Sequence, residues 1–545
     1  MQTTTAEGGT FLWLSPQGAR QADSLLRRLE NCDRHGLDPA YFAARELRDD
    51  WDHLCRMSLA EGEPINELLT RLEAGLTKAL MVYATGMQFG FVDAHEVMNY
   101  LEEETDLQGR KIPLAEGKRK MLALHNIPLK RADASFATEL LQRLTREGTD
   151  FWSALEPSSA YYRSLQQEWA GLNALGDASW EPIPLIGDTL IREGHSHWIV
   201  PRIAHRLQIT GELDREADAA SFVTLTPELL QAVNRFRVKN LLPEDNSVGT
   251  FTLRYLNRPL QYYKDRIRIN LERARWQYAE EKGSKYVIAN VAAFMLQAVN
   301  EETDSVLEMR ICCGTRRNKT PLLSSRINYV ELNPYWNVPQ SIIRREMIPA
   351  YRQDSAYFRK NQLRIYDSSG TEVDPHQINW SDYRGGVPFT VKQDNREGNS
   401  LGRIIFRFPN NFAVYLHDTP SRWAFMNTNR AVSHGCVRLE KPLDFALFLL
   451  EEPDEVLEDR IRAAMDLPPV SEKGKELIAK EEYQELKQYN LKEHIPLFLD
   501  YHTVYFSAAG ELAYADDPYV YDPPLLKALD ELNPINTNEA LYGPL

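Results

Sequence analysis

The chain has 545 residues, of which 43% are hydrophobic and 26% are charged, and a net charge of −15 at pH 7. This is a globular composition, the length implies several domains, and the negative charge argues against a nucleic-acid or anionic-membrane partner. The longest apolar run, Val287 to Val299, holds 13 residues and includes Asn290. That is too short to span a bilayer, and we expect a buried strand-to-helix segment there.

The first part of the chain, to about residue 185, has the pattern of packed helices. Ser15-Pro16 is typical of a helix start, and Gly36 is typical of a helix end. An apolar face at helical spacing indicates a packed scaffold rather than a binding groove, and its members are Ile65, Leu68, Leu69, Leu72 and Leu76.

A second helical unit follows over residues 196–257. Short helices are predicted at Ile203 to Leu207, Leu229 to Val238 and Thr250 to Leu256. Residues 258–282 are rich in Arg, Glu and Tyr, which predicts a long helix with a polar face leading into the next domain.

The periodicity changes to that of strands from about residue 285. Strands are predicted at Tyr286 to Ala289, Val306 to Cys312, Gly402 to Phe408 and Phe412 to His417. The long segment 334–386 interrupts them, and such insertions are usually functional or disordered. Near the end, Ile495 to Phe506 and Leu512 to Tyr514 flank a Ser-Ala-Ala-Gly turn, which predicts a hairpin that completes or braces the sheet.

The five cysteines do not form the pattern of a disulfide framework, because their number is odd. Cys32 and Cys55 remain open as a pair, and Cys312-Cys313 is predicted to be a buried structural pair of thiols on opposite sheet faces. The chain has no CxxC or HExxH motif, and His434 and Cys436 lack further spaced ligands, so no metal is expected.

The most informative feature is Ser433-His434-Gly435-Cys436-Val437-Arg438, with His417 placed 19 residues before Cys436. A thiol is a strong nucleophile only as its thiolate, and a free cysteine is ionised to only a few per cent near neutral pH. An imidazole can take that proton and later return it to a leaving group. The pair therefore predicts acyl transfer through a thioester. In papain-like proteases the cysteine precedes the histidine, so the order here argues against that class.

These residues resemble the signature of the YkuD-type L,D-transpeptidases, a histidine and a spacer followed by Ser/Thr-His-Gly-Cys. Longer blocks are similar to the large YcbB-type branch: Asn333 to Pro339, Leu401-Gly402, Phe408 to Asn410 and Val414 to Pro420. The resemblance is strong over about 285–460, moderate over 495–525 and weak before about residue 195.

The resemblance implies a multidomain α+β fold. Its parts would be an all-helical scaffold, a small helical peptidoglycan-binding-like module and a mostly β catalytic domain with an inserted helical cap. The corresponding ranges are 1–195 for the scaffold, 196–257 for the module, 258–284 for a connecting helix, 285–465 for the catalytic domain with the cap at about 334–386, and 466–545 for a C-terminal helix and hairpin. In the module, Glu244 to Ser247 replaces the usual Asp-Gly, so a structural role is at least as well supported as glycan binding.

The site residues follow from the same resemblance. Cys436 is the expected nucleophile and His417 the general base and then acid, with the carbonyl of Asp418 orienting the imidazole. The backbone N–H groups of Gly435 and Cys436 are expected to face the oxyanion. The roles of other residues stay open between chemistry and structure. His434 would contact substrate or shape the turn, and Ser433 would form a hydrogen bond within the turn. Arg438 would bind a stem-peptide carboxylate or hold the loop in place, and Tyr415 and Trp423 would line the groove or serve packing.

The implied reaction joins peptidoglycan stem peptides. Cys436 would displace the terminal D-Ala of a tetrapeptide, and a side-chain amine of a second stem would take the acyl group in a 3→3 crosslink, without a cofactor. The family also implies carbapenems as inhibitors and other cell-wall synthesis enzymes as partners. The sequence leaves open an L,D-carboxypeptidase or crosslink-cleaving amidase, a protein-to-peptidoglycan anchoring transferase, and a non-catalytic wall-binding protein.

The start of the chain, Met1 to Glu7, has neither a basic nor an apolar region, which taken alone indicates a cytosolic protein. The resemblance implies instead a periplasmic or cell-envelope protein whose signal or anchor is absent from this sequence.

Overall fold

The computed structural model describes residues 11–56, 65–101, 103–105, 111–113, 120–121, 125, 128–146, 150–176, 181–383, 386–395, 397–450 and 454–535. The expectation for Met1 to Glu7 lies outside these residues. The chain divides into two units, one formed by 1–279 and 502–545 and the other by 280–501. Among the described residues, no helix combines the length and the apolar character that a membrane span requires.

The first unit is built mainly from helices. Those before residue 180 are α1 (Pro16–Glu30), α2 (Ala44–Arg56), α3 (Ile65–Phe89), α4 (Ala94–Asn99), α5 (Phe136–Arg146), α6 (Asp150–Leu155) and α7 (Ala160–Ala174). Ser15 caps α1 as predicted, with its Oγ accepting from Gly18 N at 2.9 Å. The apolar face of α3 is buried at Leu68, Leu72 and Leu76, although Ile65 is exposed. Short strand pairs also occur here: β1 (Tyr100–Leu101) with β4 (Lys120–Met121), and β2 (Glu103–Thr105) with β3 (Lys111–Pro113).

The module region has its own apolar core. Its helices are α8 (Val200–Thr210), α9 (Pro227–Lys239) and α10 (Thr250–Leu256), with the strand pair β5 (Ile191–Arg192) and β6 (Ser247–Val248), and the long α11 (Leu260–Arg275) follows. Arg237 spans the loop after α9, where its guanidinium donates to the carbonyl of Asp245 at 3.0 Å. The Glu244 to Ser247 sequence is therefore tied to α9 by its backbone.

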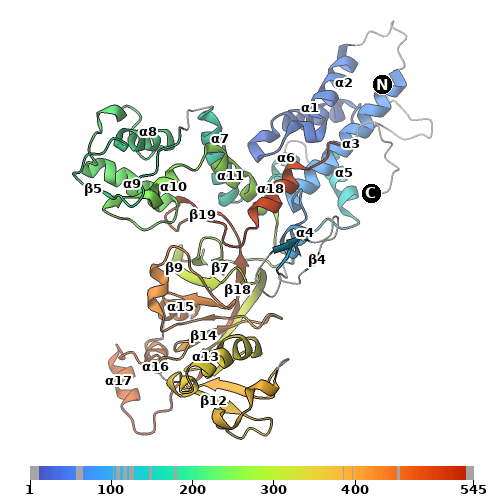
Figure 1. Cartoon of the computed structure of the whole chain (residues 1–545). Helices are drawn as coiled ribbons and strands as arrows, with labels where there is room; N and C mark the ends of the chain where they lie inside the picture. Colours follow the sequence, from blue (N-terminus) through green and yellow to red (C-terminus); the bar gives the residue numbers. More distant parts are fainter. Residues whose placement is uncertain are drawn as a thin grey trace. The chain divides into compact units, whose positions relative to one another are not determined.

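The second unit contains a nine-stranded sheet, and part of it is visible in Figure 1. Its strands are β7 (Lys285–Asn290), β8 (Met295–Asn300), β9 (Ser305–Gly314), β10 (Leu323–Leu332), β14 (Ile404–Arg407), β15 (Leu416–His417), β16 (Ala431–Ser433), β17 (Val437–Leu439) and β18 (Gln488–Asp500). The order is β16-β9-β17-β15-β14-β10-β18-β7-β8, and β8 also pairs with β9, so the sheet closes on itself. Among the described residues, the α-helices of this unit outside the insertion are α15 (Pro442–Leu449), α16 (Glu455–Ala464) and α17 (Glu472–Ile478).

Two local predictions in this sheet were wrong. The segment from Val287 to Val299 is a hairpin, not a strand followed by a helix, because Asn290 Oδ1 accepts from the N–H groups of Ala292 and Ala293 and turns the chain. The strand expected from Phe412 is reduced to Leu416–His417. Asn410 holds Phe412 and Val414 in a turn through its side-chain oxygen at 3.0 and 3.2 Å.

The insertion between β10 and β14 carries helices and, in addition, a three-stranded sheet (Figure 1). Its elements are β11 (Trp336–Asn337), α12 (Gln340–Ile342), a π-helical turn at Ile343–Met347, α13 (Ile348–Gln353), α14 (Tyr357–Lys360), β12 (Leu363–Tyr366) and β13 (Thr390–Gln393). It has its own core around Phe358 and Trp380, whose rings stack at 5.7 Å. The segment therefore extends beyond residue 386, because β13 pairs with both β11 and β12.

The C-terminal segment is divided between the two units. β18 lies inside the large sheet, between β10 and β7. The hairpin of β19 (Val504–Phe506) and β20 (Leu512–Tyr514) belongs to the first unit instead, together with α18 (Asp522–Asp530). Val504 and Tyr514 share an apolar cluster with Leu165 of α7 and Ile267 of α11, which is why the hairpin does not join the nine-stranded sheet.

Candidate active site

Three strands of the large sheet set the positions of the predicted catalytic residues. β15 pairs antiparallel with β14 through Ile405 and His417, and parallel with β17 through Leu416–Val437 and His417–Arg438. The Val437 N–H donates to the Tyr415 carbonyl at 3.0 Å, so the register continues to Tyr415 and Cys436. Successive side chains in a strand point to opposite faces. Tyr415, His417, Cys436 and Arg438 therefore share one face, while Leu416, Val437 and Leu439 are buried on the other.

His417 is buried and held by the backbone. Its Nδ1 lies 2.5 Å from the carbonyl oxygen of Asp418, which accepts the hydrogen bond, so Nδ1 carries the proton and Nε2 is left as an acceptor. Burial, with a smaller effect of Arg438, lowers the pKa of His417 to about 3, although hydrogen bonds to the Asp418 and Leu401 carbonyls act in the other direction. The imidazole is therefore neutral near pH 7 and able to accept a proton.

Cys436 is half-buried at the end of the turn that precedes β17. Burial raises the pKa of its thiol, and hydrogen bonds to the backbone and side chain of Tyr415 oppose that rise, as do Arg407 and Arg438. The resting thiol is therefore protonated, and it needs a base to take its proton as it attacks. The Tyr415 and His417 rings lie 5.7 Å apart on the same face.

The turn before Cys436 is braced from within and from a neighbouring loop. Ser433 Oγ donates to the Cys436 carbonyl at 2.6 Å and accepts from Gly435 N at 3.1 Å. Gly435 has φ +122°, a conformation that glycine adopts readily. The buried Thr320 hydroxyl donates to the Gly435 carbonyl at 2.8 Å and accepts from Gly314 N at 2.8 Å. The Gly435 N–H, expected at the oxyanion, is thus bonded to Ser433 in this structure.

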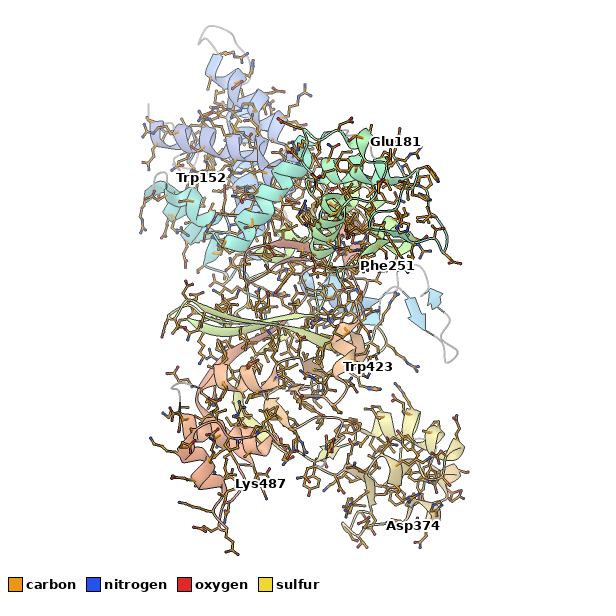
Figure 2. The ribbon with its side chains drawn as sticks, turned by 90° about the vertical axis from the view of Figure 1, so that its left-hand side faces the viewer. Trp152, Glu181, Phe251, Asp374, Trp423 and Lys487 are labelled. Atoms are coloured by element: carbon orange, nitrogen blue, oxygen red, sulfur yellow. The ribbon has the colours of Figure 1, made fainter. Side chains whose placement is uncertain are left out.

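The remaining predicted residues differ in their burial and in their hydrogen-bond partners. The Asp418 side chain accepts from Arg403 N at 3.0 Å, so it fixes the neighbouring turn while its carbonyl orients His417. Arg438 Nε is buried without a hydrogen-bond partner among the described residues. His434 Nε2 lies 2.5 Å from Glu346 Oε1 in the π-helical turn of the insertion. Trp423, in the 3-10 helix Arg422–Met426, is 68% exposed and so is not packed into a core (Figure 2).

Four residues around the site were not predicted from the sequence: Thr320, Glu331, Glu346 and Arg407. Only Arg407 carried a signal, a charge at the end of the apolar strand Ile404-Ile405-Phe406. The others act through contacts between segments far apart in the chain. Within the described part of the chain, no three His, Cys, Asp or Glu side chains gather in a way that would hold a metal ion.

Two regions of the chain match models of known protein families. Residues 284–457 match the YkuD family model, described as the L,D-transpeptidase catalytic domain, and residues 5–168 match the model described as a Scaffold domain. A Haemophilus influenzae protein named "Putative L,D-transpeptidase" is 36% identical over 166 residues, which cover 30% of this chain and 34% of that protein. The match thus spans about a third of that relative's length.

Solved structures of low similarity were also found. An L,D-transpeptidase from Mycobacterium smegmatis is 15% identical with a TM-score of 0.17, covering 30% of this chain and 53% of its own. A crystal structure of the L,D-transpeptidase of Xylanimonas cellulosilytica is 15% identical with a TM-score of 0.16, covering 48% of this chain and 93% of its own. Scores this low add nothing to the assignment.

Proposed function

We propose that this chain, which carries the L,D-transpeptidase catalytic domain of the YkuD family together with a Scaffold domain, is a peptidoglycan L,D-transpeptidase with Cys436 as its nucleophile. The observation that carries the proposal is the strand register. It brings Cys436 and His417 to one face of the parallel pair β15–β17, inside the region that matches the catalytic domain. His417 is neutral and has its Nδ1 hydrogen bonded, which leaves Nε2 as the base.

In the first step, the Cys436 thiol gives its proton to His417 Nε2 and its sulfur attacks the carbonyl of the third stem residue. The carbon–sulfur bond forms as the amide bond to D-Ala breaks, and His417 returns the proton to the departing amine. In the second step, a side-chain amine of another stem attacks the thioester and loses a proton through His417 to the leaving sulfur. The product is a 3→3 crosslink, and carbapenems would acylate the same sulfur.

Two groups at the site are proposed to hold the donor peptide. The Cys436 N–H would donate to the developing oxyanion, because the Gly435 N–H is bonded to Ser433. Arg438 would bind a stem-peptide carboxylate with its planar fork, which its unpartnered Nε among the described residues favours over a role in tying down the loop. His434 and Trp423 are exposed enough to contact a bound stem, and Tyr415 lies directly beside the sulfur.

A peptidoglycan substrate places the proposed activity in the cell envelope or periplasm, where other cell-wall synthesis enzymes would be its partners. Glycan binding by residues 196–257 would add to this, although the backbone tie from Arg237 supports a structural role for the replaced loop.

The test is mass spectrometry of the purified protein with a disaccharide-tetrapeptide, for wild type and Cys436→Ala. We expect a crosslinked dimer that has lost one D-Ala, formed by wild type alone, and a carbapenem adduct on wild type alone. Tripeptide without dimer would indicate the carboxypeptidase alternative. If wild type forms no adduct and shows no turnover, the catalytic proposal is overturned and the wall-binding alternative remains.

A further inference from the structure

A row of side chains crosses the sheet and ends at the nucleophile. β10 (Leu323–Leu332) pairs with β14 through Tyr329 and Arg407, and β14 pairs with β15 through Ile405–His417 and Phe406–Leu416. One further step of the same register sets Arg407 opposite Tyr415, the residue before β15, and Tyr415 is level with Cys436, the residue before β17. Arg407, at the end of β14, therefore lies in one row with Tyr415 and Cys436, which precede β15 and β17, on the face of the sheet that carries His417.

Arg407 is held on both sides along this row. Its guanidinium carbon lies 4.7 Å from the centre of the Tyr415 ring, within the range of a cation–π contact. Its Nε donates to Glu331 Oε2 at 2.9 Å, and its Nη2 lies 2.8 Å from the same oxygen. Glu331 is two residues from Tyr329 on β10, so it reaches Arg407 diagonally across the strand pair. The guanidinium is thus fixed over the ring rather than free in solvent.

Tyr415 connects this clamp to the sulfur. Its hydroxyl hydrogen-bonds the Cys436 thiol, and burial, followed by the interaction with Cys436, raises the pKa of Tyr415. The phenol therefore keeps its proton and serves as a donor to the sulfur. Because the cation already restricts the orientation of the Tyr415 ring, less conformational entropy is lost when the hydroxyl hydrogen-bonds the thiolate.

We propose that Arg407, clamped by Glu331, is a positioning residue that holds the Tyr415 hydroxyl on the sulfur of Cys436. The inference rests on the proposed function only in taking Cys436 as the nucleophile. When His417 takes the thiol proton, the Tyr415 O–H donates to the anionic sulfur, and no proton leaves Tyr415. Arg407 acts through the ring and touches neither sulfur nor substrate.

The experiment measures the rate of Cys436 alkylation by iodoacetamide against pH, by mass spectrometry, in a Cys55→Ser background that removes the exposed thiol. Arg407→Gln should raise the apparent pKa of Cys436 by about one unit, which slows labelling roughly tenfold at pH 7.5. Arg407→Lys keeps the positive charge but lacks the planar guanidinium. The apparent pKa of Cys436 in this variant should lie between those of wild type and Arg407→Gln. Arg326→Gln is the matched control, since Arg326 lies on β10 of the same sheet and forms an ion pair with Glu280, which is not part of this row.

Two further variants decide whether Arg407 acts by position. Glu331→Gln removes a negative charge, so electrostatics alone would lower the apparent pKa of Cys436, whereas loss of the clamp should raise it. In a Tyr415→Phe background, Arg407→Gln should have little further effect. A lowered pKa in Glu331→Gln, or a full and additive shift in the double variant, would overturn the proposal.

Turnover separates this inference from the proposed function. If Arg407→Gln leaves the alkylation profile unchanged and raises only KM for the tetrapeptide, Arg407 contacts substrate and the positioning role is wrong. If the shifts appear but wild type neither acylates nor crosslinks, the positioning role stands and the proposed function fails. Thermal unfolding of each variant within a few degrees of wild type shows that a changed profile is not a loss of fold.

Discussion

His434 Nε2 and Glu346 Oε1 lie 2.5 Å apart, so the turn that carries Cys436 is hydrogen-bonded to the π-helical turn of the insertion. Both side chains are about half exposed, at 41% and 50%. Exposed pairs contribute at most about 1 kcal/mol, and π-helical turns are frequent at functional sites. The contact therefore serves to connect two segments more than to stabilise the fold.

Glu346→Ala should loosen the insertion without destabilising the protein. We expect faster amide hydrogen exchange over Ile343–Met347, and a free energy of unfolding within about 1 kcal/mol of wild type. Hydrogen-exchange mass spectrometry measures this, with the exposed neighbour Arg345→Ala as control. Equal exchange in both variants would mean that the contact does not hold the insertion.

Thr320→Val should destabilise the turn that precedes Cys436, because it removes hydrogen bonds that support this turn. The Thr320 hydroxyl bonds both Gly435 O and Gly314 N in a fully buried position, so valine leaves a buried donor and a buried acceptor unsatisfied. The expected loss is about 2–4 kcal/mol of unfolding free energy, together with most of the Cys436 acylation rate. Urea unfolding and carbapenem adduct formation measure the two effects. Thr320→Ser keeps the hydroxyl and should stay close to wild type.

The stability of the protein should fall in acid because of His417. Its folded pKa of about 3 lies below the ordinary value of 6.5, so between these values the unfolded chain binds a proton that the folded chain does not. The stabilisation is fully present above about pH 6.5 and is lost as the pH falls toward 3. His417→Asn, which does not titrate, should lose about 2–3 kcal/mol less than wild type between pH 7.5 and 4.5. Parallel curves from urea unfolding would contradict the lowered pKa.

Native labelling should separate the five thiols into two classes. Cys55 is exposed and Cys436 half-buried, whereas Cys32, Cys312 and Cys313 are buried. Burial raises the pKa of Cys32 to about 12 and that of Cys312 to about 11, and it also raises the pKa of Cys313. Peptide mapping after brief iodoacetamide treatment should find adducts at Cys55 and Cys436 only. Labelling of Cys312 at a similar rate would show that the sheet opens.

Much of the architecture was predictable because it depends on local patterns. The Ser15-Pro16 helix start, the apolar face of α3 and the apolar run of β9 each lie within one element. The Ser-His-Gly-Cys motif likewise directed attention to Cys436 and His417. The multidomain α+β fold with a helical scaffold and a mostly β catalytic domain was predicted correctly on this basis.

The rest depends on which distant segments meet. β17 lies between β15 and β9, and the sequence of Val437–Leu439 does not predict which strands are its neighbours. Thr320 reaches Gly435, and Glu331 reaches Arg407, only because the sheet register brings them together. The β-branched and aromatic residues of Val504–Phe506 likewise predict a strand but not the surface that buries it, and the structure places this strand against α7 and α11.

The closed sheet has a consequence for how the protein is made. β18 lies between β10 and β7, and it is the last strand of the sheet to leave the ribosome, well after Cys436. A nascent or truncated chain that ends before Gln488 leaves both β7 and β10 without the neighbour that joins them. The sheet that carries His417 and Cys436 can therefore close only after Asp500 has been translated, although both residues are made before it.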